Sequence, residues 1–125
     1  MTKVSVGVDI IEIARFQRSV ERHPRLISRL FSEKEINLVG RVANPSLKFA
    51  SRFAAKEATW KAMSLGLGGV DFQEVEILKN SNGKPYVVLN GRAKDKFESL
   101  FGINIDLSIS HTDTLAVAMV AICKR

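Results

Sequence analysis

The stretch RFAAKEATWKAM, residues 52–63, has the spacing of an amphipathic helix. Large apolar residues recur at helical intervals, with small residues in the adjacent arc: Phe49, Phe53, Trp60 and Met63, with Ala50, Ala54, Ala58 and Ala62. At about 100° per residue, however, Lys56, Glu57 and Lys61 project into this same arc. A charge among apolar groups is costly unless it is paired or binds something. The three charged residues therefore need partners.

Upstream of this helix the sequence predicts a strand and three shorter helices. Their order is a half-buried strand over 4–10, a helix from 13 to 22, a short helix over 25–31, a helix with a Ser32–Glu35 capping box through about residue 42, and the start of the long helix at 44–46. The strand places Asp9 near its C-terminal end.

Downstream, the long helix is expected to end near residue 66. After it come a loop over 66–69, a hairpin of 70–78 and 84–89 around Asn82-Gly83, a helix over 90–102, and strands 103–110 and 115–124 joined by a turn at 111–114. This order predicts an α+β fold with a mainly antiparallel sheet packed against the long helix.

The composition limits the class of protein. A chain of 125 residues, 46% apolar and 26% charged, fits one globular domain spanning residues 1–125. It shows neither a signal peptide nor the roughly 18 apolar residues of a membrane helix. Cys123 is the only cysteine, so a reducing cytoplasm is the expected location. The net charge of +6 predicts an anionic partner, which is a nucleic acid, a nucleotide or an acidic protein.

Asp9 and Glu57 are the first candidate site. Mg²⁺ is usually held by one or two carboxylates together with water and substrate phosphates. A strand-end aspartate and a helix glutamate supply such ligands if the helix packs on the strand. The structural alternative is that Asp9 caps the next helix and Glu57 pairs with Lys61, four residues on.

Lys56, Lys61 and His111 are candidates for binding phosphate. Lysine binds phosphate as a point charge, and a histidine in a turn can bind phosphate or carry a proton. The alternatives are that the lysine stems lie along apolar surface with their ammonium groups in water, and that His111 is a polar surface residue.

Arg15, Arg18 and Arg22 form a basic stripe on the helix over 13–22. Another face of that helix is apolar and is expected to pack against the core, through Ile13, Phe16 and Val20. The stripe is either a solvated face or a docking surface for nucleic acid or an acidic protein.

Four motifs occur in order along the chain: GVDIIEIARF (7–16), RFAAKEATWKAM (52–63), NGKPYV (82–87) and SISHTDTLAVA (108–118). Together they resemble the holo-acyl-carrier-protein synthases, the small bacterial 4′-phosphopantetheinyl transferases. The resemblance covers essentially the whole chain, and its most specific part is FAAKEA followed by Lys61-Ala62. Leu115 departs from the pattern, because an aromatic residue is common there.

The resemblance implies a 4′-phosphopantetheinyl transferase-like fold and a reaction. The 4′-phosphopantetheine arm of coenzyme A would pass to a serine of apo acyl carrier protein, releasing adenosine 3′,5′-bisphosphate. By resemblance, Asp9 and Glu57 hold Mg²⁺, while Lys56, Lys61 and His111 bind coenzyme A or act in catalysis. Lys61 would stabilise the departing bisphosphate, and either Glu57 or His111 would be the base.

The resemblance also implies a homotrimer with active sites between subunits, and an acidic carrier protein held by Arg15, Arg18 and Arg22. No membrane association is expected. The alternative is a basic nucleic-acid-binding module without catalysis, although the chain lacks an aromatic RNA-binding motif and zinc-ligand spacing.

Overall fold

The structure is a computed structural model that describes residues 2–40, 42–64 and 69–125. Its elements follow the predicted order, which confirms the α+β class. They are β1 (Lys3–Glu12), α1 (Ile13–Arg22), α2 (Leu26–Leu30), α3 (Glu33–Val39), α4 (Pro45–Ala62), the 3₁₀ helix η1 (Phe72–Glu74), β2 (Val75–Lys79), β3 (Pro85–Leu89), α5 (Gly91–Ser99), β4 (Gly102–His111) and β5 (Leu115–Lys124).

Several element ends differ from the predicted ones. The long helix ends at Ala62, and the predicted end near residue 66 lies outside the described residues. Ser64, just past the helix, has a φ of 53°, and Phe101, just past α5, has a φ of 60°. Left-handed residues of this kind end helices, so both stop earlier than their apolar spacing suggests. The third helix ends at Val39, and the hairpin's first strand begins only at Val75, after η1.

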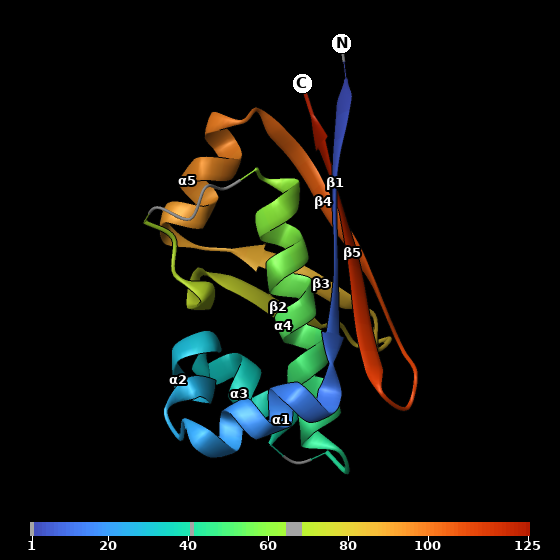
Figure 1. Cartoon of the computed structure of the whole chain (residues 1–125). Coiled ribbons are helices and arrows are strands. Elements are labelled where there is room, and N and C mark those ends of the chain that lie inside the picture. The colour runs from blue at the N-terminus through green and yellow to red at the C-terminus, as the bar shows by residue number, and fades with distance from the viewer. Residues whose placement is uncertain (1, 41, 65–68) are drawn as a thin grey trace.

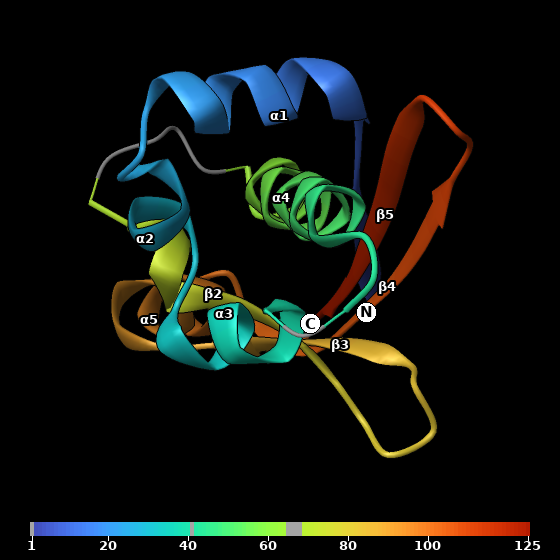
Figure 2. The ribbon, with the colours of Figure 1, turned by 90° about the horizontal axis from the view of Figure 1, so that it is seen from below.

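Two antiparallel sheets enclose α4. The larger sheet has the order β1-β5-β4, and the smaller one is the β2-β3 hairpin. Seen along its axis, α4 lies in the centre, with the larger sheet on one side, β2 and β3 on another, and α1 across a third (Figures 1 and 2). The predicted packing of a mainly antiparallel sheet against the long helix is therefore confirmed.

The alanine side of α4 lies against β1 and β5. Ala54, Ala58 and Ala62 are buried there, and a Cβ added to Gly7 of β1 would lie 2.0 Å from the carbonyl oxygen of Ala58. Only glycine permits this approach of strand and helix. Ser5 Oγ also donates to the carbonyl oxygen of Ala62, at 2.5 Å. The face of β1 that carries Ser5, Gly7 and Asp9 is thus the one that meets the helix.

The aromatic side of α4 packs against the second layer. The rings of Trp60 and Phe72 are stacked with centroids 4.6 Å apart, and Phe53 lies 5.7 Å from Phe72 and 5.5 Å from Phe16. With two opposite sides packed, α4 keeps two flanks on which polar groups can reach solvent.

The other face of β1 is apolar and exposed. Val4, Val6, Val8 and Ile10 are 69%, 63%, 56% and 61% exposed, and Met119 beside Val8 on β5 is 49% exposed. The strand is half-buried as predicted, but through its small and polar face. A contiguous apolar strip of this kind marks an interaction surface.

None of the helices in the described ranges is long and apolar enough to cross a membrane.

Candidate active site

Asp9 and Lys61 meet on one flank of α4. Lys61 Nζ donates to Asp9 Oδ1 and to the carbonyl oxygen of Val8, both at 3.0 Å. The Asp9 side chain is 16% exposed and that of Lys61 is 55% exposed. Asp9 Oδ2 is buried and accepts no hydrogen bond from the described residues. The cluster therefore holds a buried carboxylate oxygen without a hydrogen-bond partner beside an accessible ammonium group.

Glu57 belongs to the same cluster. Burial raises the pKa of Glu57, the negative charge of Asp9 raises it further, and Lys61 opposes both effects. Two negatively charged carboxylates that lie close together repel each other, and a bound divalent cation would relieve that repulsion. No group of three or more histidine, cysteine or acidic residues suited to a metal occurs in the described parts of the chain. The donor set is thus two carboxylates, which suits Mg²⁺ completed by water and phosphate oxygens.

Both structural alternatives for this pair are wrong. Asp9 lies inside β1, and Glu12 occupies the N-cap position of α1. Lys61 makes its ion pair with Asp9 of the neighbouring strand and none with Glu57.

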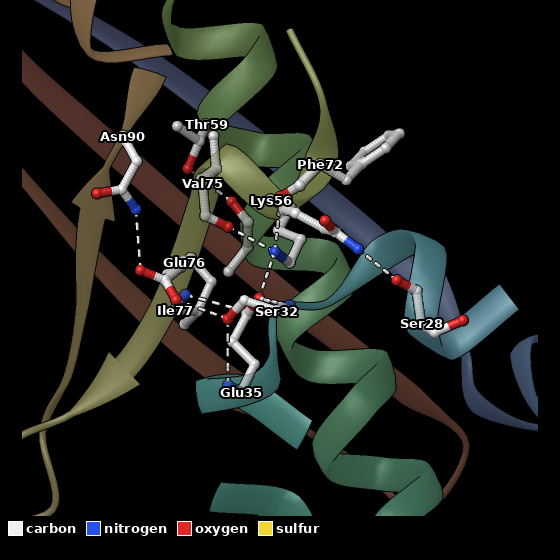
Figure 3. A network of polar contacts seen from close by, with 12 residues as sticks. Ser28, Ser32, Glu35, Lys56, Thr59, Phe72, Val75, Glu76, Ile77 and Asn90 are labelled. Carbon is white, nitrogen blue, oxygen red and sulfur yellow. Dashed lines mark hydrogen bonds and ion pairs between the residues drawn. The ribbon is translucent and has the colours of Figure 1, made fainter. Parts of the chain in front are cut away.

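Lys56 lies elsewhere, inside the protein. Its side chain is fully buried, and Nζ donates to Glu35 Oε1 at 2.7 Å, to the carbonyl oxygen of Phe72 at 2.8 Å and to that of Val75 (Figure 3). An ammonium group has three donors, so none remains for a ligand. Burial lowers the pKa of Lys56, while Glu35 and Glu76 oppose the shift. This arrangement does not favour the expectation that Lys56 binds coenzyme A, because the second layer covers its ammonium group.

His111 lies on the opposite flank of α4 from Asp9. In the sheet register Asp9 pairs with Ala118, which pairs with Ile109, so His111 is two strands away and two residues further along. It lines a pocket of about 180 Å³ with Lys48, Arg52 and Lys79. By helical spacing, Lys48 and Arg52 lie roughly 140–220° around α4 from Glu57 and Lys61. One chain therefore does not bring His111 to the carboxylates.

The pocket beside His111 contains residues that the sequence did not single out. Arg52 Nε is buried and has no hydrogen-bond partner in the described part of the chain. Burial lowers the pKa of Arg52, and Glu35 opposes the shift. Together with Lys48 and Lys79, this guanidinium makes the pocket cationic and suited to an anion. Lys48 and Arg52 are four residues apart on α4 and therefore lie on the same face of the helix. That spacing was the only feature of the sequence that could have indicated a cationic pocket.

The arginine stripe is exposed along α1. Arg15, Arg18 and Arg22 take part in none of the ion pairs formed between described residues. Arg15 borders a groove of about 340 Å³ whose walls include Phe16, Phe53 and Leu115, the residue that departs from the family pattern. Because the groove also includes residues 10–12, which follow Asp9 directly, it adjoins the carboxylate cluster.

A second groove adjoins the far end of the stripe. It has a volume of about 310 Å³ and is lined by Arg22, Arg25, Leu26 and Arg29, among others. Sequence reasoning missed Arg25 and Arg29, because they lie in the loop before α2 and in α2 itself rather than on the same helix. The basic surface is thus wider than the stripe.

Comparisons with known proteins show the family of this chain. Residues 5–120 match the family described as the 4′-phosphopantetheinyl transferase superfamily. A holo-[acyl-carrier-protein] synthase of Moorella thermoacetica is 40% identical over 116 residues, covering 93% of this chain and 91% of the relative.

Two solved structures that contain coenzyme A are also similar. The ACPS–CoA complex of Chronobacterium ammoniagenes has a TM-score of 0.90 at 28% identity and covers 98% of both chains. The Helicobacter pylori holo-[acyl-carrier-protein] synthase in complex with coenzyme A has a TM-score of 0.81 at 32% identity, covering 94% of this chain and 98% of that one. The chain therefore belongs to the 4′-phosphopantetheinyl transferase superfamily.

Proposed function

We propose that this protein transfers the 4′-phosphopantetheine arm of coenzyme A to a serine of apo acyl carrier protein. The serine oxygen attacks the β-phosphorus, the bond from that phosphorus to the bridging oxygen breaks, and adenosine 3′,5′-bisphosphate leaves. The observation that carries the proposal is the cluster of Asp9, Glu57 and Lys61, in which two carboxylates and an accessible lysine converge. The names of its relatives supply the substrates.

Asp9 and Glu57 would hold a Mg²⁺ ion. The buried, unpartnered Oδ2 of Asp9 and the raised pKa of Glu57 both fit residues that bind a cation. When bound, Mg²⁺ would neutralise charge on the pyrophosphate of coenzyme A. Transfer of a phosphoryl-type group depends chiefly on positioning and charge neutralisation, and this donor set provides both.

Lys61 is suited to stabilise the leaving bisphosphate. Two of its three donors engage the carbonyl oxygen of Val8 and the carboxylate of Asp9, which fixes the ammonium group at the cluster. Its third donor and its half-exposed position leave it able to reach a phosphate oxygen. The ammonium group would therefore meet the negative charge that develops on the departing oxygen.

Glu57 is the preferred base for the serine proton. It is a carboxylate of the cluster, so it would stand close enough to the reacting phosphate to accept the serine proton. His111 is the rival, but within one chain it lies on the other flank of α4. A role for His111 at the cluster therefore requires that it come from a second copy of the chain.

A homotrimer would supply that second copy. Assembly would bury the exposed apolar strip formed by Val4, Val6, Val8 and Ile10. The family resemblance suggests that the assembly contains three chains. With neighbouring copies packed together, the carboxylate flank of one α4 would face the cationic pocket of another chain. Coenzyme A would then bind between subunits, with its pyrophosphate at Asp9 and Glu57 and another phosphate beside His111 and Arg52.

The carrier protein would dock on α1. Arg15, Arg18 and Arg22 are exposed, and the groove at Arg15 adjoins Asp9, so an acidic partner held there lies close to the reacting phosphate. The whole chain, residues 1–125, would act as one domain. We place the reaction in the cytoplasm, because a chain with one cysteine has no need of an oxidising compartment.

Mass spectrometry of the carrier tests the proposal. The protein is incubated with Mg²⁺, coenzyme A and an apo carrier, and each carrier molecule should gain the mass of one phosphopantetheine arm. EDTA should prevent this gain in mass. A carrier left unmodified by the folded protein contradicts the proposal. No separate observation favours the nucleic-acid-binding alternative, because the same arginines could equally well bind an acidic protein.

A further inference from the structure

The polar contacts of Lys56 form the centre of a buried network. Glu35, at the third position of α3, accepts from Lys56 Nζ and from the Ser32 backbone N–H through Oε1, and from the Ile77 backbone N–H at 3.1 Å through Oε2. Glu76 of β2 extends the network, accepting from Ser32 Oγ at 2.6 Å and Asn90 Nδ2 at 2.9 Å. Figure 3 shows these groups converging between α4, the start of α3 and β2.

This network holds α4 from the side opposite its alanine face. Alanines pressed against a glycine-containing strand give close contact but few projecting groups that resist rotation of the helix. Lys56, by contrast, reaches from α4 into three directional bonds on α3, η1 and β2. These bonds, together with the stacking of Trp60 on Phe72, hold the angle at which α4 is set between the two sheets.

That angle decides where Glu57 points. Glu57 follows Lys56 by about 100° around the helix. A rotation of α4 by about 20° would move a carboxylate roughly 6 Å from the helix axis by about 2 Å. Metal–ligand distances tolerate only about 0.2 Å, and a displacement of about 1 Å can cost roughly 100-fold in rate.

We propose that Lys56 and Glu35 are positioning residues, whose ion pair sets the rotation of α4 at which Glu57 and Lys61 face Asp9. Neither residue touches coenzyme A. The inference rests on the proposed function in one respect, the assignment of Asp9 and Glu57 to a divalent cation.

The test measures Mn²⁺ binding to the full-length protein without coenzyme A, from the electron paramagnetic resonance signal of free Mn²⁺. Lys56→Met and Glu35→Gln are compared with wild type at a temperature where circular dichroism shows each to be folded. Lys84→Met is the matched control, because it breaks the exposed ion pair with Asp106. Asp9→Asn defines the Mn²⁺ binding that belongs to the cluster.

Both network variants should weaken this Mn²⁺ binding about tenfold or more and lower kcat by at least about tenfold, whereas Lys84→Met should change neither. If Lys56 instead bound coenzyme A, its variant would raise the KM for coenzyme A and leave Mn²⁺ binding unchanged, which would overturn the proposal. Should Lys56→Met not fold, Glu35→Gln decides, since it keeps the side-chain volume.

Failure of the proposed function gives a different pattern. Wild type would then leave the carrier unmodified, whatever the Mn²⁺ binding of the network variants. An Asp9→Asn variant with unchanged Mn²⁺ binding and unchanged transfer would instead overturn the metal-site assignment, and the positioning proposal would fall with it. Normal Mn²⁺ binding and kcat in a folded network variant, with Asp9→Asn impaired, overturns the positioning role alone.

Discussion

Lys56 and Lys61 stand five residues apart on α4 and have opposite surroundings. Lys56 is fully buried, with three acceptors around its ammonium group. Lys61 is 55% exposed and has two acceptors, one of which is the carboxylate of Asp9. Around them lie two polar regions: the buried network of Lys56, Glu35 and Glu76, and the open cluster of Asp9, Glu57 and Lys61.

The difference shows that the layer packed over a residue, more than its place in the sequence, decides what its charge can do. Both lysines interrupt the apolar arc of the same helix. The side of α4 that faces η1 and α3 is covered, so Lys56 must satisfy every donor internally. The flank beside β1 stays open, so Lys61 keeps a donor for a ligand.

Loss of a cluster carboxylate should have the largest effect. Asp9→Asn keeps the size of the side chain but removes half of the carboxylate pair, so turnover should fall at least about 100-fold at limiting Mg²⁺. The rate of mass gain on the carrier measures it, with circular dichroism as the control for folding. Near-normal turnover would show that the open cluster is not the reactive region.

Subunit mixing tests whether the open cluster is completed by a second chain. Asp9→Asn and His111→Ala should each be inactive as homotrimers. Co-expressed with two different tags and isolated as mixed trimers, they should recover up to about a third of wild-type activity, because one of the three sites in each mixed trimer receives both intact residues. No recovery would show that sites are not shared, and a fully active His111→Ala would exclude that residue from catalysis.

The buried network should dominate stability. Lys56→Met leaves Glu35 charged and unpaired inside the protein, so the free energy of unfolding should fall by about 3–5 kcal/mol. Urea denaturation followed by circular dichroism measures this. Lys84→Met, at the exposed pair with Asp106, should change the same quantity by no more than about 1 kcal/mol. Equal effects at the two pairs would contradict the contrast between buried and exposed lysines.

The arginine stripe should affect the carrier alone. Reversing Arg15 and Arg22 to glutamate should raise the KM for the carrier roughly tenfold and weaken its dependence on salt, because exposed charges mainly steer association. The KM for coenzyme A should stay within about twofold, since its phosphates are assigned elsewhere. Steady-state kinetics at two ionic strengths measures both. A raised KM for coenzyme A with an unchanged KM for the carrier would mean that the arginine stripe binds coenzyme A and not the carrier.

The smallest expected effect is a gain in stability. Because the pKa of Glu57 is raised above its ordinary value of 4.5, ionising it costs more in the folded than in the unfolded chain. Glu57→Gln should therefore raise the melting temperature in EDTA at neutral pH by a few degrees at most, while abolishing transfer. The gain should grow as pH rises through the window above 4.5 and vanish below it. A lower melting temperature at neutral pH would contradict the unfavourable ionisation of Glu57 that its burial and the charge of Asp9 cause.

The sequence predicted the fold well where local signals are strong. The Ser32–Glu35 capping box forms, with Glu35 Oε1 accepting from the Ser32 N–H at 3.0 Å. The hairpin turn forms around Asn82-Gly83, with Gly83 at a φ of 83° and its N–H donating to the carbonyl oxygen of Asn80. The alternating strands form as well, because turn chemistry and side-chain alternation act over few residues. The early end of α5 was missed, since a left-handed residue such as Phe101 carries no clear signal in its side chain.

The site was predicted in part. The helix that carries Glu57 packs on the strand that carries Asp9, as the metal-site hypothesis required, but the ion pair of Asp9 with Lys61 was not foreseen. Lys56 shares every sequence property of a phosphate-binding lysine and yet is buried by Phe72 and Glu35. Which face of a helix a second layer covers is a long-range property that spacing does not contain. The exposure of the apolar face of β1 could not be predicted for the same reason. Alternation shows that a strand has two different faces, but it does not show that the face with Gly7 is the one that packs against α4.

A crystal structure with Mg²⁺ and coenzyme A bound tests the contrast between the two regions most directly. It should show Mg²⁺ about 2.1 Å from oxygens of Asp9 and Glu57, the pyrophosphate within hydrogen-bond distance of Lys61, and Lys56 still bonded to Glu35. A pyrophosphate bound away from Asp9 and Glu57, or a Lys56 released from Glu35 to contact it, would contradict the account.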